Sequence, residues 1–268
     1  MNIRLAAGLV LAFFTLAGGA QAELCHGKPD SLGTARVIAL DPALHRHLGL
    51  LEYDETLPLQ DHEVVLTFDD GPLPPYTAKV LDALAAECVK ANFFLVGQMA
   101  GTYPALVRRE YQEGHTIGTH TQHHPHLNQL TAEAATKEIS DGIATVSRVL
   151  GSREAVAPFF RFPYLDPKPA KEAIALKLGL VVWSTDFHAS DWTLVSSEQV
   201  AAIAIARLER SKKGILMLHD IQERTALAMP LILSELKKRG YRVVHVVPAD
   251  AANPKTAASP GQWTATVR

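Results

Sequence analysis

The sequence has no strong excess of charge of either sign. Its 268 residues include 26 basic and 28 acidic side chains, for a formal net charge of −2. A near-balanced charge gives no electrostatic footprint for nucleic acid or for anionic lipid. Since 47% of the residues are hydrophobic and 20% charged, the composition also excludes a disordered or fibrous chain. We therefore expect one large globular domain whose partner is neutral or weakly charged, and not a nucleic acid.

Long apolar runs are missing after the first 22 residues, so nothing there predicts a membrane span. The opening "MNIRLAAGLVLAFFTLAGGAQA" combines one positive charge at Arg4, an apolar stretch, and small residues at Ala20 and Ala22. This order is typical of a cleaved export signal, and the apolar stretch is shorter than the ~20 residues of a spanning helix. We predict that residues 1–22 are removed and that the protein is secreted or periplasmic. The alternative is a single membrane anchor.

Cysteine is scarce as well, with Cys25 and Cys88 as its two positions. An oxidising compartment would permit a disulfide between them. Cys88 also lies in a helical pattern where a small buried apolar residue would fit, so both alternatives stay open. The sequence carries no indication of an oligomeric state.

From residue 62 to 248 the chain alternates short apolar runs with stretches of helical spacing. The apolar runs are "EVVLTFDD", "ANFFLVG", "HTIGTHT", "PFFRFPY", "LVVWSTDFH", "GILMLHD" and "YRVVHVVP". About seven such alternations predict an α/β fold in which helices cover a parallel sheet. Glycines follow the helical stretches, where left-handed caps are expected; they are Gly114, Gly151, Gly179, Gly214 and Gly240.

The two ends of the chain are patterned more weakly. Residues 23–61 contain one candidate strand, "ARVIAL", and are predicted to form an N-terminal extension lying across the barrel. Residues 249–268 are rich in Ala, Pro and Thr and are predicted to be a poorly ordered tail. No second domain or longer repeat is evident.

Polar residues stand at the ends of the predicted strands. Fully parallel strands are apolar on both faces, so a polar residue at the last position needs a reason. In an α/β barrel the carboxyl ends of all strands open on one face, where reacting groups gather. The polar strand ends are Asp69, Asp70, Thr119, His120, Arg161, Asp186, His219 and Asp220.

Five of the twelve residues in "HTIGTHTQHHPH" are histidine. His120 and His124 are four positions apart, a common arrangement for two imidazoles on one metal, although His123 has a workable spacing too. "TFDDG" adds two adjacent carboxylates, of which Asp70 can bind a metal while Asp69 accepts a proton. Solvated loop histidines and a plain Asp-Asp-Gly turn are the alternatives. Two imidazoles, one carboxylate and a water make up a catalytic zinc site.

Five motifs then appear in order between about residues 62 and 248: "LTFDDGP", "THTQHHPHL", "RFPY", "DFHASDW" and "ILMLHD". Together they resemble the motifs of the polysaccharide deacetylases, carbohydrate esterase family four, which include chitin, peptidoglycan and nodulation-factor deacetylases. The resemblance implies a distorted (β/α) barrel, similar to a TIM barrel but with fewer than eight repeats, over residues 62–248.

The resemblance also implies roles for individual residues. Asp70, His120 and His124 would bind a divalent metal, most simply Zn²⁺, with Co²⁺, Ni²⁺ and Mn²⁺ as alternatives. Asp69 would be the catalytic base and His219 the catalytic acid.

Two further residues would support that pair. Arg161 would hold Asp69 by a charge-assisted contact, and Asp191 would pair with His219 and raise its pKa. The implied substrate-binding residues are Tyr164, Trp192, Met217 and Leu218.

The sequence departs from the family pattern at three places. Asp186 and Asp191 are five positions apart where three is usual, so Asp186 is interpreted as a strand-end polar residue. His188, inside this expansion, is interpreted as an exposed loop histidine. Leu165 stands where glycine is common, and Met217 stands where leucine is usual. The remaining histidines are interpreted as bystanders; they are His115, His123 and His126.

The sequence thus favours a metal-dependent hydrolase that removes N-acetyl groups from N-acetylhexosamine units of a chitin-like or peptidoglycan-like polysaccharide. Two alternatives stay open. One is an O-acetyl esterase acting on an acetylated glycan. The other is a non-catalytic barrel that binds carbohydrate or metal. Degenerate members would be expected to lose the base or the acid, and this chain has both.

Overall fold

A computed structural model describes residues 28–264. The export signal predicted for residues 1–22 and the cysteine at position 25 lie outside the described residues. No helix within residues 28–264 is both long enough and apolar enough to cross a membrane.

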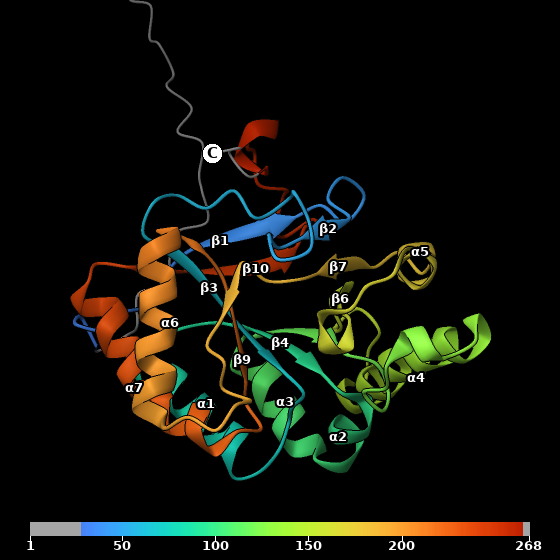
Figure 1. Cartoon of the computed structure of the whole chain (residues 1–268), viewed down its shortest axis with the longest axis horizontal. Coiled ribbons are helices and arrows are strands. Elements are labelled where there is room, and N and C mark those ends of the chain that lie inside the picture. Colours follow the sequence, from blue (N-terminus) through green and yellow to red (C-terminus); the bar gives the residue numbers. More distant parts are fainter. Residues whose placement is uncertain (1–27, 265–268) are drawn as a thin grey trace, which may run out of the picture.

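One sheet of parallel ladders forms the centre of the molecule (Figure 1). Its order is β1-β10-β3-β4-β5-β6-β7-β2, with β9 on the other edge of β3 and β8 beside β9. The strands are β1 (Thr34–Leu40), β2 (His47–Leu48), β3 (Glu63–Asp69), β4 (Asn92–Leu95), β5 (Thr116–Thr119), β6 (Phe159–Arg161), β7 (Val181–Trp183), β8 (Phe187–His188), β9 (Gly214–His219) and β10 (Arg242–Pro248). Each of the seven predicted apolar runs contains a strand, and the predicted α/β fold is confirmed.

Strand β3 changes its pairing partner along one edge. It pairs with β10 only at Glu63 and Val64, and with β4 only from Thr67 to Asp69. Its other edge pairs with β9 from Val64 to Asp69. A regular barrel keeps a constant stagger between strands, so this change of partner along one strand distorts the barrel.

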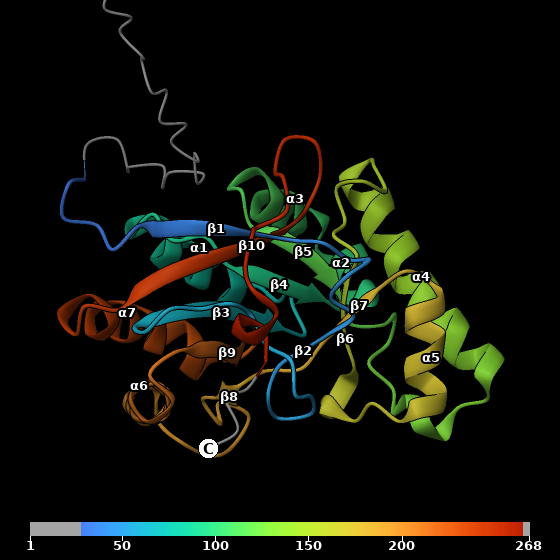
Figure 2. The same ribbon diagram turned by 90° about the horizontal axis from the view of Figure 1, so that it is seen from above.

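Helices surround the sheet, with α1, α6 and α7 on one side and α4 and α5 on the opposite side (Figures 1 and 2). Helix α4 begins after a Thr131 side-chain cap and is followed by the C-cap residue Gly151, whose φ is 79°. Helix α6 begins with a capping box between Ser196 and Gln199. The helices are α1 (Tyr76–Ala86), α2 (Gly97–Thr102), α3 (Pro104–Gln112), α4 (Ala132–Leu150), α5 (Pro169–Lys177), α6 (Ser197–Ser211) and α7 (Glu223–Lys238), with short 3₁₀ turns η1 (Leu127–Gln129), η2 (Pro163–Leu165) and η3 (Pro260–Gln262).

The two faces of strand β3 pack into different core clusters. In β3, Val64 and Leu66 pack into a cluster with the helices, whereas Val65 packs into a second cluster with residues of the other strands. Side chains alternate along a strand, so Thr67 and Asp69 share the face of Val65. The second cluster is therefore continued by a polar layer at the carboxyl ends of the strands.

In the N-terminal segment, the candidate strand "ARVIAL" is confirmed as part of β1. Strand β1 pairs with β10 and β2 pairs with β7, so the N-terminal extension adds strands to the sheet. In the predicted tail, residues 249–264 are mostly exposed and irregular apart from η3. Trp263 is 5% exposed in the second cluster and stacks on His45 at 3.5 Å between ring centroids. Burial of this large aromatic side chain attaches the segment to the core although its composition is rich in Ala, Pro and Thr.

Candidate active site

Residues at the carboxyl ends of five strands, β3, β5, β6, β8 and β9, line a cavity of about 410 Å³. Asp69 of β3 is the register partner of His219 of β9, so these two groups lie side by side. His120 follows β5, and Arg161 is the last residue of β6. Parallel pairing alone therefore brings these four distant positions to one edge of the sheet.

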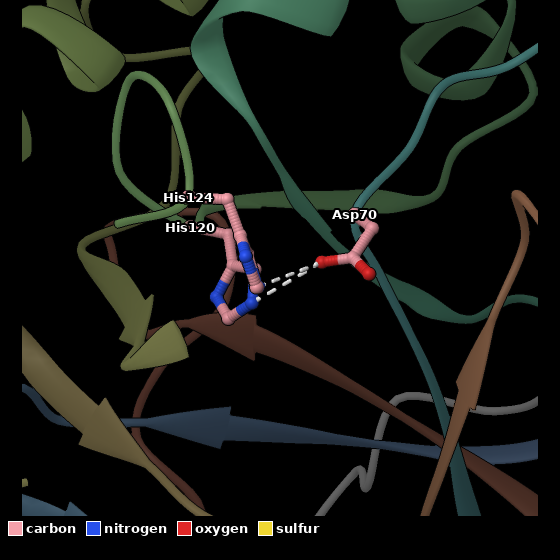
Figure 3. A group of neighbouring side chains, drawn as sticks. All are labelled: Asp70, His120 and His124. Atoms are coloured by element: carbon pink, nitrogen blue, oxygen red, sulfur yellow. Dashed lines mark ion pairs between the residues drawn. The ribbon is translucent and has the colours of Figure 1, made fainter. Parts of the chain in front are cut away.

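Asp70, His120 and His124 converge on one point (Figure 3). The Oδ1 atom of Asp70 lies 3.4 Å from Nε2 of His120 and 3.2 Å from Nε2 of His124. Their candidate ligand atoms all lie within 4.8 Å of one another. The structure thus brings together the three predicted metal ligands.

The protonation of this cluster suits a cation. Nδ1 of His120 donates a hydrogen bond to the Arg161 carbonyl at 2.7 Å, which leaves an unprotonated Nε2 facing Asp70. Burial, followed by the charge of His124, holds the pKa of His120 well below its usual value. Oδ1 of Asp70 is buried without a hydrogen-bond donor. Acceptors that face one another in this way fit a divalent metal ion, which all three could bind.

Asp69 is buried against a fully buried arginine. Nη1 of Arg161 donates to Oδ1 of Asp69 at 2.6 Å and to Thr67 Oγ1 at 3.0 Å, while Nη2 donates to the Ser184 carbonyl at 2.8 Å. The guanidinium carbon also lies 4.2 Å from the centroid of the Phe94 ring. Burial raises the pKa of Asp69, and the Arg161 charge offsets part of that rise.

His219 is tied to a second buried carboxylate. Nδ1 of His219 donates to Oδ1 of Asp191 at 2.9 Å, and Oδ2 of Asp191 accepts from the His219 amide and the Thr225 hydroxyl. Burial opposes the imidazolium, but the hydrogen bond and charge of Asp191, with the charges of Asp70 and Asp69, raise the pKa of His219 to about 9. A protonated imidazole therefore stands beside the cavity at neutral pH.

Comparison with known proteins assigns this arrangement to a family. A sequence profile described as polysaccharide deacetylase matches residues 57–183. A peptidoglycan-N-acetylglucosamine deacetylase of Bacillus cereus is 34% identical over 196 residues, which cover 71% of this chain and 89% of the relative. The chain belongs to the polysaccharide deacetylase family.

Two further deacetylases extend the comparison. The peptidoglycan-N-acetylglucosamine deacetylase PgdA of Listeria monocytogenes is 32% identical over 68% of this chain, and the match spans 38% of the length of that relative. The structure of the Bdellovibrio bacteriovorus peptidoglycan deacetylase Bd3279 superposes with a TM-score of 0.72 at 33% identity, covering 82% of this chain and 61% of that one. The chain is thus similar to these deacetylases in sequence and, to Bd3279, in fold.

The resemblance to the deacetylases predicts four substrate-binding residues, and three of them line the cavity. They are Tyr164, Trp192 and Met217. The Trp192 ring meets His219 at 5.4 Å, and the Tyr164 ring meets His124 at 4.7 Å, both edge-on. Leu218, the fourth, is not among the lining residues, because its side chain is fully buried in the cluster under the helices. Side chains alternate along β9, so Met217 and His219 share the cavity face and Leu218 points the other way.

Asp186 and Asp191 are two positions further apart than in the deacetylase motif. The segment between them contains a residue that was not expected to line the cavity. His188, predicted to be an exposed loop residue, is half-buried in the cavity wall and meets the Trp192 ring at 4.5 Å. Asp186 has a structural position, since its buried carboxylate accepts from the amides of Leu50 and Ile215 at 2.8 Å.

Several other positions could not be placed from sequence. Leu51 lines the cavity although it comes from the weakly patterned N-terminal segment, and no sequence signal pointed to it. His123 points to Glu138 at 2.8 Å. His126 stacks on Tyr164 at 3.7 Å.

Proposed function

We propose that this protein removes N-acetyl groups from N-acetylhexosamine units of a cell-wall or chitin-like polysaccharide in a metal-dependent reaction. The observation that carries the proposal is the meeting of three groups at one cavity. These are the cluster Asp70, His120 and His124, the pair Asp69 and Arg161, and the pair His219 and Asp191. Amide hydrolysis needs a nucleophile, stabilisation of an oxyanion and a proton for the departing amine.

The metal site would supply the electrophilic part of this chemistry. A divalent ion held by Asp70, His120 and His124 would polarise the acetyl carbonyl and make water a better nucleophile near neutral pH. Zinc is the simplest candidate for two imidazoles and one carboxylate, and other divalent ions accept the same ligands.

The chain's own residues would move the protons. Asp69 is the base that accepts a proton from the attacking water, and Arg161 fixes the orientation of its carboxylate. His219, held protonated by Asp191, is the acid that donates a proton to the sugar nitrogen as the carbon–nitrogen bond breaks. The products are acetate and a free amine. Each proton transfer contributes about 10²–10⁴ in rate.

The sequence and the relatives support a reaction at the cell wall. An export signal over residues 1–22 would deliver the protein to the periplasm or the exterior, where cell-wall glycans lie. The relatives reported above are named peptidoglycan deacetylases. Peptidoglycan is therefore the first substrate to test.

A test of the proposal is acetate release from peptidoglycan and chitooligosaccharides, with acetylated xylan as the O-acetyl arm. We expect release from the N-acetylated glycans, loss of nearly all activity on chelation, and recovery when zinc returns. An Asp69→Asn variant should keep its fold and lose about 10²–10⁴ in kcat. Full activity of the chelated protein or of Asp69→Asn would overturn the mechanism, and release from xylan alone would overturn the substrate class.

A further inference from the structure

A second, smaller cavity of about 250 Å³ lies beside the active-site cavity. The two cavities share Leu51 and His188 as lining residues, so they are direct neighbours. Helix α6 supplies the outer wall through Arg207 and Arg210. No sequence motif of the family includes these arginines.

The charge of this second cavity is not neutralised by ion pairs. Among residues 28–264, neither Arg207 nor Arg210 lies within ion-pair distance of a carboxylate, whereas Arg161 and Arg239 do. Nη1 of Arg207 donates to the His188 carbonyl at 2.6 Å and to its Nδ1 at 2.7 Å. These contacts fix the guanidinium against the shared wall but leave its charge unpaired.

The other titratable groups of the wall do not cancel this charge. The carboxylate of Asp186 is buried, and its oxygens accept from the amides of Leu50 and Ile215 and from the Thr56 hydroxyl. Burial, followed by the Arg207 charge, lowers the pKa of His188 to about 4, so this imidazole adds no charge at neutral pH. The wall therefore carries two arginines and one acid, Asp186, whose carboxylate is buried and already hydrogen-bonded. The net charge of the cavity is positive.

We infer that this second cavity, bounded by Arg207 and Arg210, is a subsite for a carboxylate carried by the glycan. The inference rests on the proposed function and narrows its substrate class to acidic glycans. Arginine suits this task because its planar fork matches a carboxylate, and a guanidinium already anchored loses less freedom on binding. In peptidoglycan the carboxylate has two sources, the lactyl ether of muramic acid and the attached peptide.

The test compares three substrates of equal sugar length. They are a neutral chitooligosaccharide, a peptidoglycan glycan whose peptides have been removed so that the lactyl carboxylates are free, and a peptidoglycan fragment that keeps its peptides. The variants are Arg210→Gln and the double variant Arg207→Gln with Arg210→Gln. The matched control is Arg148→Gln, which removes the same charge from an exposed position in the last turn of α4, across the molecule from α6 (Figure 1).

We expect the wild type to have a higher kcat/KM on an acidic glycan than on the neutral one, mainly through KM. We call kcat/KM on an acidic glycan divided by kcat/KM on the neutral one the acidic-to-neutral ratio. Arg210→Gln should lower this ratio about threefold, the scale of an exposed ion pair. The double variant should lower it by about tenfold or more, as expected for a charged hydrogen bond. Arg148→Gln should leave the ratio at the wild-type value, and added salt should reduce the ratio in the wild type. The acidic substrate that shows the effect identifies the source of the carboxylate.

An acidic-to-neutral ratio that stays the same in the double variant would overturn the subsite while leaving the deacetylase function in place. If no substrate releases acetate, the proposed function fails instead. Calorimetric titration of the same glycans then still decides on the subsite, because tighter binding of the acidic glycan that disappears in the double variant supports it and equal binding rejects it. Thermal melts of all variants check that they are folded.

Discussion

Individual residues of the active site hold backbone conformations that most residues avoid. The φ angles of Asp70, His124 and Tyr164 are 76°, 57° and 63°, all in the left-handed region. A residue with a side chain pays ~1–3 kcal/mol there and persists only where the surroundings determine its conformation. Next to Asp70, a Cβ on Gly71 would overlap the Asp220 carboxylate, so only glycine fits this turn. The turn that contains Asp70 is therefore tightly packed against Asp220.

The contact between Asp191 and His219 makes a prediction for pH dependence. Replacing Asp191 by Asn removes the charge that, against burial, raises the pKa of His219 to about 9. We expect the alkaline limb of the kcat profile to move to lower pH, because the acid loses its proton earlier. The measurement is kcat against pH for the wild type and Asp191→Asn.

The stability of the two proteins should differ in a pH-dependent way. The His219 pKa is raised in the folded state, so the stabilisation from its pairing is complete below the unfolded pKa of about 6.5 and is lost as pH rises through about 9. Asp191→Asn should therefore destabilise the protein more at pH 6 than at pH 9.5. Urea melts at the two pH values measure the difference, and an equal loss at both would contradict the assigned pairing.

At the scale of secondary-structure elements, the alternation along β9 separates substrate contact from stability. Met217 faces the cavity, whereas Leu218 is buried under the helices. We expect Leu218→Ala to lower the free energy of unfolding by about 2–5 kcal/mol through the cavity it leaves, with little change in KM. Met217→Ala should instead change KM and kcat on the glycan.

Chemical denaturation and steady-state kinetics of the two variants form a matched pair, since both remove an apolar side chain from adjacent positions of one strand. If Leu218→Ala changed KM as much as Met217→Ala does, the orientation of β9 described above would be wrong. Helix α6 presents a similar division of roles, because its buried residues such as Val200 and Leu208 pack on the sheet while Arg207 turns to the second cavity.

At the scale of the whole molecule, the described residues before 62 and after 248 pack against each other and against the core. Residue Glu55 of the N-terminal segment forms a bridge with Thr264, and Trp263 packs with Ile38 and Leu57 in the second core cluster. The described segments before and after residues 62–248 therefore share one core cluster with the strands, and we expect them to unfold together.

A Trp263→Ala variant tests this role of the tail. We expect it to lose about 3–5 kcal/mol of unfolding free energy, the usual cost of deleting a buried large aromatic side chain. Urea denaturation measures the loss, and Trp183→Phe in the same cluster serves as a milder comparison. A Trp263→Ala protein as stable as the wild type would show that the tail does not contribute to the core.

Local patterns in the sequence determined the class of fold and marked most of the candidate site residues. The seven apolar runs predicted strands because a buried parallel strand must be apolar on both faces, and polar residues such as Asp69 and His219 stood out at their ends for the same reason. The candidate metal site was predictable because His120 and His124 are close in sequence and Asp70 follows directly on a strand.

The tertiary structure alone decided which way each side chain points and which distant segments meet. The place of Leu51 in the cavity, the burial of Trp263 and the position of Arg207 beside His188 depend on contacts between residues far apart in the chain. Such contacts leave no local periodicity, because they are fixed by the packing of strands and helices against one another and not by the neighbours of each residue in sequence.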